Sequence, residues 1–339
     1  MHCRLGWMLL AALATTARAE PAAPGASASA PGAAAITDED RSEASEARLK
    51  VVAAASESPA ALDAKNPSGK SPNLRALTDD PIVGNASRIE GDERKGLVAF
   101  TFDDGPNPET TPAVIDALEK YNIPATFFIV TQRIAGKHGE KSREILRREL
   151  ADGFLVGSHS VTHASLRHAS GDQLTREIDA SIRTLAVQAN RPIGMFRAPY
   201  GALSPAGRMR LKKLGLTEVF WSVDTLDWKA HDPERLRRKV MAMIRHDEGG
   251  VVLMHDVKPI TARVVVEVLD DLEAENCARL ATGREPILPV SLHYFLRDGK
   301  TPRELPAAVK HRTDAYKAAL PERCAKRPPA EAASQHASK

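Results

Sequence analysis

Two adjacent acids, Asp103 and Asp104, follow directly on the apolar run LVAFTF and precede a Gly-Pro turn. Carboxylates this close disfavour each other's ionised form, so the pair needs compensation from a metal ion or an arginine. The alternative is an Asx-type turn, in which Asp and Gly only end a strand. The pair alone leaves both interpretations open.

Two histidines, His159 and His163, follow the run FLVGS at positions i and i+4. On a helical turn they would share one face, which suits two nitrogen ligands to a single metal. A pair of surface or capping histidines is the alternative.

Three further polar clusters also follow apolar runs. Arg197 stands in RAPYG, Asp224 and Asp227 stand in DTLDW, and His255 and Asp256 end the run VVLMHD. Each cluster alone is typical of a solvated loop. The other histidines of the region are interpreted as loop or helix-end residues, namely His168, His231, His246 beside Asp247, and His293.

The elements that must position these residues lie between residues 96 and 299, where strand-like runs alternate with helical patterns. The seven runs are LVAFTF, ATFFIV, FLVGS, GMFRA, TEVFWSV, VVLMH and ILPVSLHYF. Helix starts are predicted at Thr111-Pro112, Ser204-Pro205 and Asp232-Pro233, and helix ends near Gly153, Gly215 and Gly249. This alternation predicts an α/β domain with a parallel sheet. The carboxyl ends of parallel barrel strands meet on one face, so the five polar clusters should converge there.

The segments on either side of this region indicate that the protein is exported and that these segments have little regular structure. Residues 1–19 resemble a secretory signal, with an apolar stretch from Leu5 to Leu13 and cleavage near Ala19. That stretch is shorter than the roughly 20 residues of a membrane span. Residues 20–94 are predicted to be a mostly disordered low-complexity linker, and residues 300–339 a basic, extended tail that could contact an anionic wall or membrane surface.

The amino-acid composition argues against nucleic acid as a binding partner. The chain has 339 residues with 47 Lys and Arg against 44 Asp and Glu, a net charge of +3. With aromatic residues at 4%, neither charge nor stacking surface indicates a nucleic-acid binder. After signal removal two cysteines remain, Cys277 and Cys324, which could pair in an oxidising compartment or stay as free thiols.

The segment 95–299 resembles the polysaccharide deacetylase family, the NodB-homology domain of carbohydrate esterase family 4. The motifs that carry the resemblance are TFDDGP, HSVTH, RAPYG, DTLDW and LMHD, in that order. The resemblance implies a distorted (β/α) barrel of seven parallel strands. It also implies that Asp104, His159 and His163 bind a divalent metal, with Zn²⁺ the default and Co²⁺ or Ni²⁺ open.

The resemblance further implies a role for each remaining motif residue. Asp103, paired with Arg197, is the general base toward a metal-bound water, and His255, oriented by Asp227, is the general acid. The backbone N–H of Tyr200 would stabilise the oxyanion, while Trp228 and Leu253 would form an apolar wall around the acetyl methyl.

The predicted function is hydrolytic N-deacetylation of an N-acetylated glycan. Peptidoglycan is favoured because the signal indicates a periplasmic or extracellular location. Three alternatives remain open: chitooligosaccharide deacetylation, acetyl-xylan ester hydrolysis on the same fold, and a non-catalytic module that binds cell wall.

Overall fold

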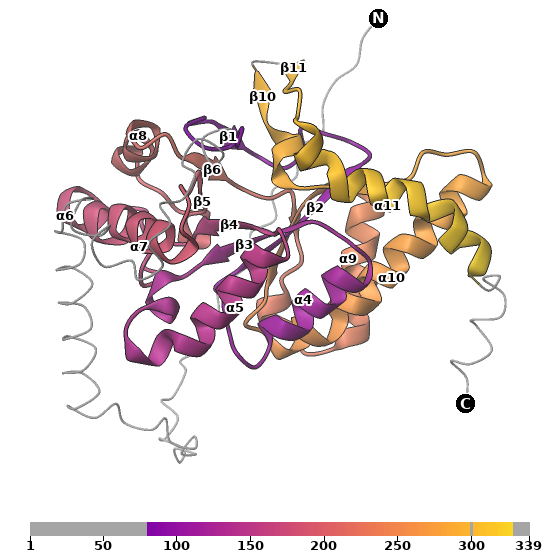
Figure 1. Ribbon diagram of the computed structural model, residues 1–339, viewed down its shortest axis with the longest axis horizontal. Helices are drawn as coiled ribbons and strands as arrows, with labels where there is room; N and C mark the ends of the chain where they lie inside the picture. The colour runs from indigo at the N-terminus through magenta and orange to yellow at the C-terminus, as the bar shows by residue number, and fades with distance from the viewer. Residues whose placement is uncertain (1–79, 299–300, 328–339) are drawn as a thin grey trace, which may run out of the picture. The chain divides into compact units, whose positions relative to one another are not determined.

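The computed structural model describes residues 80–298 and 301–327 of the chain (Figure 1). The predicted signal peptide, residues 20–79 of the predicted linker and residues 328–339 of the tail lie outside these ranges. Across the described residues, no helix combines the length and the apolar character that a membrane crossing requires.

The core of the fold is a distorted parallel half-barrel. Along its hydrogen-bonded path the strands are β1 (Arg88–Ile89), β6 (Thr217–Val219), β5 (Met195–Phe196), β4 (Leu155–Ser158), β3 (Ala125–Ile129), β2 (Leu97–Asp103), β8 (Gly249–His255) and β7 (Val223–Asp224). A ninth strand, β9 (Leu288–Pro289), pairs in parallel with the start of β2. The predicted parallel α/β fold is therefore confirmed.

The strands differ from the seven predicted runs at several points. The run TEVFWSV forms two strands, because β6 pairs with β1 and β5 whereas β7 pairs with β8. The chain changes partner across Phe220–Ser222 and the ladder breaks there. The run ILPVSLHYF contributes only β9 before the short helix η6 (Leu292–Phe295), and β1 was not predicted.

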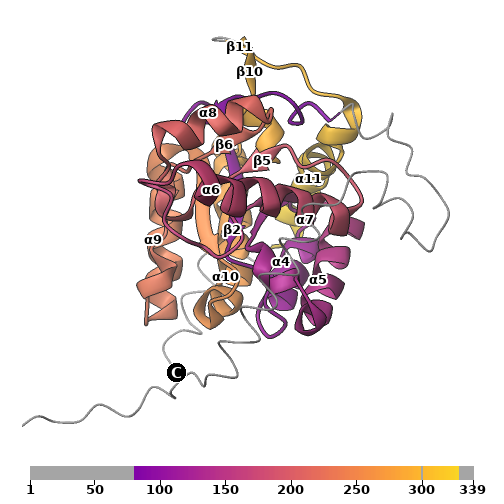
Figure 2. The same ribbon diagram turned by 90° about the vertical axis from the view of Figure 1, so that its left-hand side faces the viewer.

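Helices cover the outside of the sheet. They are α4 (Thr111–Lys120), α5 (Glu140–Ala151), α6 (Gly171–Leu174), which runs through the π-helical η3 (Thr175–Asp179) into α7 (Ala180–Ala189), then α8 (Pro205–Lys213), α9 (Pro233–Asp247), α10 (Pro259–Ala281) and α11 (Ala307–Lys326). The helices α6, α7 and α8 form the side that faces the viewer in Figure 2. The side chains of Ser204 and Asp232 cap α8 and α9, as their sequence positions predicted.

Strand β2 shows how the sheet separates core from site. Val98, Phe100 and Phe102 point outward into the core beneath the helices. Because side chains alternate along a strand, Ala99, Thr101 and Asp103 share the opposite, inner face. Ala99 lies there in a second apolar cluster with Phe128 and Val251. Asp103 is thus delivered to the carboxyl end of the inner face.

The predicted disordered linker ends earlier than residue 94. Ile82 and Ile89 are buried in the inner cluster, so this segment belongs to the folded domain. Its start is tied by His293, whose Nε2 lies 2.8 Å from Oδ1 of Asp80. His293 is therefore a buried structural residue and not the solvated loop residue that the sequence suggested.

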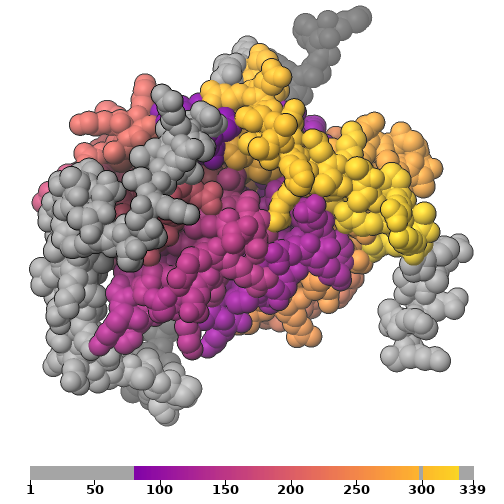
Figure 3. All heavy atoms as spheres, in the orientation of Figure 1, coloured from indigo at the N-terminus to yellow at the C-terminus, as the bar shows by residue number. Residues whose placement is uncertain are grey.

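The tail was predicted to be extended, but much of it is the helix α11. Its buried residues Thr313, Tyr316 and Leu320 recur at helical spacing among many charged residues. A disulfide between Cys277 and Cys324 links α10 to α11, so of the two possibilities left open for these cysteines the structure has the bridge. Figure 3 shows α11 on the surface, against α10 and the end of α4. The short hairpin β10 (Arg297–Asp298) and β11 (Thr301–Pro302) precedes it.

Candidate active site

The predicted site residues meet where parallel strands end. Asp103 is the last residue of β2, and His255 is the last residue of β8. His159 follows β4 directly, and Arg197 follows β5 directly. Asp227 opens the short helix η5 (Asp227–Lys229) after β7. The five motifs therefore contribute to one edge of the half-barrel, as parallel strand order requires.

Asp104, His159 and His163 form a cluster whose potential ligand atoms all lie within 4.8 Å of one another. Oδ1 of Asp104 is 3.2 Å from Nε2 of His163 and 3.6 Å from Nε2 of His159. That oxygen is buried and has no hydrogen-bond partner among the described residues. Nδ1 of His159 lies 2.8 Å from the carbonyl oxygen of Arg197, so an Nδ1–H donated there leaves Nε2 with a free lone pair. These three donors fit a divalent metal.

The two histidines do not share a helical turn, contrary to the expectation from their spacing. Residues 159–163 form a bend, with positive φ at Ser160 (71°) and His163 (61°). The carboxylate of Glu177 holds this bend by accepting the backbone N–H groups of Val161 and Thr162, at 3.1 and 2.9 Å. The bend places the two imidazole centroids 5.0 Å apart. Glu177 was not identified from the sequence, because nothing in its position marks it as a partner of the HSVTH motif.

Asp103 pairs with a fully buried arginine. Nη1 of Arg197 lies 2.7 Å from Oδ1 of Asp103 and also donates to Oγ1 of Thr101 at 2.8 Å. The other guanidinium nitrogens donate to the carbonyl oxygens of Val219 and Phe220. Burial lowers the pKa of Arg197 from its usual value, and the charge of Asp103 opposes that effect. A guanidinium does not lose its proton in the accessible pH range, so Arg197 still remains a fixed cation beside Asp103.

A second carboxylate pair of the site is formed by Asp227 and His255. Oδ1 of Asp227 lies 2.7 Å from Nδ1 of His255, and Oδ2 accepts the His255 backbone N–H at 2.7 Å. Thr261 donates a further hydrogen bond to Oδ2, a contact that the sequence did not reveal. Burial lowers the pKa of His255, but the hydrogen bond and charge of Asp227 outweigh it and raise the pKa to about 9.

No role was predicted for Asp256, the last residue of the LMHD motif, and the structure places its carboxylate against Gly105, next to Asp104 in the chain. It is fully buried and accepts a hydrogen bond from Thr111, the first residue of α4. A Cβ on Gly105 would lie 2.1 Å from Oδ2 of Asp256, so only glycine fits between Asp104 and the cis Pro106. Burial raises the pKa of Asp256 to about 7, although the Thr111 hydrogen bond opposes this. The carboxylate of Asp256 therefore packs against Gly105 of the DDGP loop and binds the first residue of α4.

The three remaining predicted residues differ in exposure. Tyr200 has left-handed backbone angles (φ 60°, ψ 15°), and its ring meets that of His163 edge-on at 4.7 Å. Leu253 is buried on the same face of β8 as His255. Trp228 lies on η5 with half of its surface exposed. Their assigned roles remain predictions.

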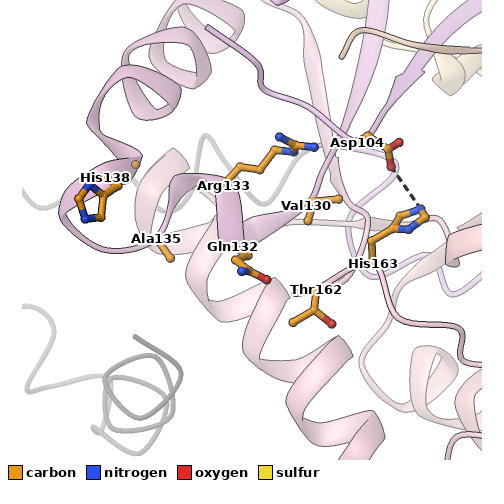
Figure 4. A pocket seen from close by; sticks show the side chains of 9 residues that line it. Asp104, Val130, Gln132, Arg133, Ala135, His138, Thr162 and His163 are labelled. Carbon is orange, nitrogen blue, oxygen red and sulfur yellow. Dashed lines mark ion pairs between the residues drawn. The ribbon is translucent and has the colours of Figure 1, made fainter. Parts of the chain in front are cut away.

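A pocket of about 530 Å³ adjoins the metal-ligand cluster, and Figure 4 shows its lining side chains. Asp104 and His163 form the side next to the cluster. The opposite side comes from the short helices η1 (Thr131–Ile134) and η2 (Lys137–Gly139). This pocket was not predicted from the sequence, because neither helix carries a recognisable motif.

Comparisons with known proteins agree with this geometry. The family profile described as polysaccharide deacetylase matches residues 90–219. A peptidoglycan-N-acetylglucosamine deacetylase from Listeria monocytogenes is 32% identical over 204 residues, which cover 60% of this chain and 41% of the relative. A chitooligosaccharide deacetylase from Azorhizobium caulinodans is 34% identical over 179 residues, 52% of this chain and 81% of the relative. This chain thus spans about two fifths of the Listeria relative and most of the rhizobial one.

Solved structures give the same fold. A peptidoglycan N-acetylglucosamine deacetylase in complex with a substituted N-oxidanyl-benzamide superposes with a TM-score of 0.51 at 26% identity, covering 57% of this chain and 88% of the other. A pseudoenzyme of carbohydrate esterase family 4 from Bacillus anthracis has a TM-score of 0.51 at 23% identity, with 56% and 65% covered. The latter likeness concerns the fold alone, so activity has to be argued from the site residues.

Proposed function

The chain belongs to the polysaccharide deacetylase family, and on that premise we propose that it hydrolyses the N-acetyl groups of a glycan, with peptidoglycan as the substrate. The observation that carries the proposal is the convergence of a three-ligand cluster with two separate ion-paired groups at one edge of the sheet. A module that only binds cell wall needs neither pair. The Listeria relative, named for peptidoglycan, supports that glycan, and the rhizobial relatives, named for chitooligosaccharides, support the second candidate.

Asp104, His159 and His163 would hold the divalent metal, with Zn²⁺ the default for one carboxylate and two imidazoles. When bound, such a metal polarises the amide carbonyl and makes water more acidic. Co²⁺ and Ni²⁺ suit the same donor set.

In this proposal Asp103 takes the proton from the attacking water. Its Oδ2 lies 3.7 Å from Nε2 of His159, so the carboxylate faces the ligand cluster. Its Oδ1 is held by Arg197 at 2.7 Å. The bond to Arg197 fixes the direction of the carboxylate and leaves Oδ2 toward the ligand cluster, where a general base would have to act.

In this proposal His255 protonates the leaving nitrogen. With a pKa raised to about 9, the imidazole carries its proton at neutral pH. Asp227 binds Nδ1, which directs Nε2 away from Asp227 and leaves its proton for the substrate. The water oxygen bonds to the acetyl carbon, the C–N bond breaks, and acetate and a free amine leave the site. The Tyr200 backbone N–H would donate to the oxyanion, and Leu253 with Trp228 would enclose the methyl group.

We also propose that the protein acts outside the cytoplasm. The signal-like residues 1–19 and the disulfide between Cys277 and Cys324 both support this location, because structural disulfides persist in oxidising compartments.

Acetate release from purified peptidoglycan, chitooligosaccharides and acetylated xylan, with and without a chelator, tests the proposal. We expect release from peptidoglycan, loss on chelation and recovery when Zn²⁺ is restored. Release from xylan alone would make the protein an ester hydrolase. Binding to peptidoglycan without acetate release from any substrate would favour the wall-binding module.

A further inference from the structure

The pocket beside the ligand cluster carries charge that the chemistry above does not use. We call it the η1 pocket, defined here by Asp104, Val130, Gln132, Arg133, His138 and His163. Its volume of about 530 Å³ lies within the range of small-ligand sites, roughly 300–1,000 Å³, and is large enough for a sugar substituent. Because Asp104 and His163 form one of its walls, a group held here would be attached close to the acetamide being hydrolysed.

Arg133 is the distinctive residue of the η1 pocket. Its side chain is exposed and extends from η1 toward Asp104, while His138 lies at the far side (Figure 4). Across residues 80–298 and 301–327 its guanidinium has no hydrogen bond or ion pair. The lining contains one carboxylate, Asp104, which belongs to the ligand cluster. The positive charge of Arg133 also acts on the buried carboxylate of Asp256 behind the pocket, but the two groups form no ion pair, so the guanidinium stays available to an anion.

Two neighbouring arginines differ from Arg133 because both form ion pairs with carboxylates. Arg148 pairs with Asp116 and Glu119. Arg143 pairs with Glu140 and also donates to the carbonyl oxygens of Ile134 and Gly136, at 2.9 and 2.7 Å. Those last bonds hold the turn between η1 and η2, so the backbone that presents Arg133 is fixed before any ligand arrives. A preformed cationic position loses less conformational freedom on binding.

We propose that the η1 pocket binds a carboxylate-bearing substituent of the glycan through Arg133, and that this contact makes the protein prefer peptidoglycan to neutral chitooligosaccharides. The inference rests on the proposed function. Chitooligosaccharides have no carboxylate, whereas peptidoglycan has one on each lactyl ether or, where a stem peptide is attached, on that peptide. Arginine binds carboxylates through two parallel N–H donors, which gives orientation as well as affinity.

The test compares kcat/KM for acetate release on four substrates. They are chitotetraose, peptide-free glycan strands with a lactyl carboxylate, the same strands methyl-esterified, and strands with intact stem peptides. The variants are Arg133→Ala, Arg133→Lys and, as a matched control, Arg238→Ala. Arg238 is an exposed arginine on α9 whose partner is Glu234.

We expect Arg133→Ala to lower kcat/KM on a carboxylate-bearing strand about tenfold, the usual scale of a hydrogen bond to a charged group. The change on chitotetraose and on the methyl ester should stay below about twofold. Arg133→Lys should recover part of the loss, because lysine retains the charge without the planar fork. Arg238→Ala should leave all four substrates unchanged. A loss on lactyl strands assigns the carboxylate to the sugar, and a loss only on peptide-bearing strands assigns it to the stem.

Two results would overturn the inference. One is an equal loss on charged and neutral substrates, which would make Arg133 a general positioning residue. The other is no loss on any substrate. In both cases wild-type acetate release would still support the proposed function, whereas no release from any of the four glycans would refute that function itself.

Discussion

Two buried carboxylates flank the ligand cluster with the same geometry but different partners. Asp103 lies 2.7 Å from Arg197, and Asp227 lies 2.7 Å from His255. The guanidinium is fully buried and does not lose its proton in the accessible pH range. The imidazole is partly exposed and titrates with a pKa raised to about 9. The first pair is therefore a fixed contact between a buried cation and a carboxylate, while the second holds a proton that can be given away.

Removing the fixed cation should have the largest effect on stability. Arg197→Ala leaves Asp103 buried without its partner, which typically costs about 3–5 kcal/mol. Chemical denaturation of the metal-free protein measures this. Arg238→Ala, which breaks an exposed pair, should cost no more than about 1 kcal/mol. Adding Asp103→Asn to Arg197→Ala should recover part of the loss, and an Arg197→Ala variant as stable as wild type would show that the two pairs do not differ as described.

The disulfide contacts neither carboxylate pair. Removing it should therefore lower the free energy of unfolding without changing the pH dependence of activity. Replacing Cys277 and Cys324 by serine removes a bridge across a sequence separation of 47 and should cost about 2–4 kcal/mol. The pH profile of kcat/KM should stay unchanged, because neither carboxylate pair is touched. Denaturation and a pH–rate profile of the same sample check both statements, and a moved limb would indicate that α11 supports the site.

Breaking the pair between Asp227 and His255 should change stability less than the two changes above. Its main effect should be on the pH dependence of kcat/KM. The His255 pKa is raised, so the pair stabilises the fold fully below the unfolded value of about 6.5 and loses this contribution as pH rises through about 9. Asp227→Asn should move the basic limb of kcat/KM downward by about one pH unit or more and leave metal content unchanged. A shift of the acidic limb instead would count against His255 as the acid.

The sequence predicted the strand ends well because each functional motif follows an apolar run, and parallel strands bring such ends together. It missed Glu177 and Thr261, which support the motifs from elsewhere in the chain, and it gave no role to Asp256 of the LMHD motif. Thr261 and Asp227 are 34 residues apart, and a hydrogen bond over that distance leaves no periodic trace in the sequence.

Two further errors have local causes. The HSVTH spacing suggested a helix, but the positive φ values at Ser160 and His163 produce a bend that residue spacing does not reveal. The tail looked extended because charges and prolines obscured the buried stripe of Thr313, Tyr316 and Leu320, and Pro321 lies inside α11. Burial against α10 outweighed the local preference.

The central claim is that the adjacent acids divide their work, with Asp104 holding the metal and Asp103 moving the proton. Metal content and kcat measured together on Asp103→Asn and Asp104→Asn test it most directly. We predict that Asp103→Asn keeps stoichiometric metal and loses at least about 10²-fold in kcat, the usual scale of general-base catalysis. Asp104→Asn should lose the metal itself, because it removes one of three ligands. Equal metal content in the two variants, or full activity of Asp103→Asn, would contradict the claim.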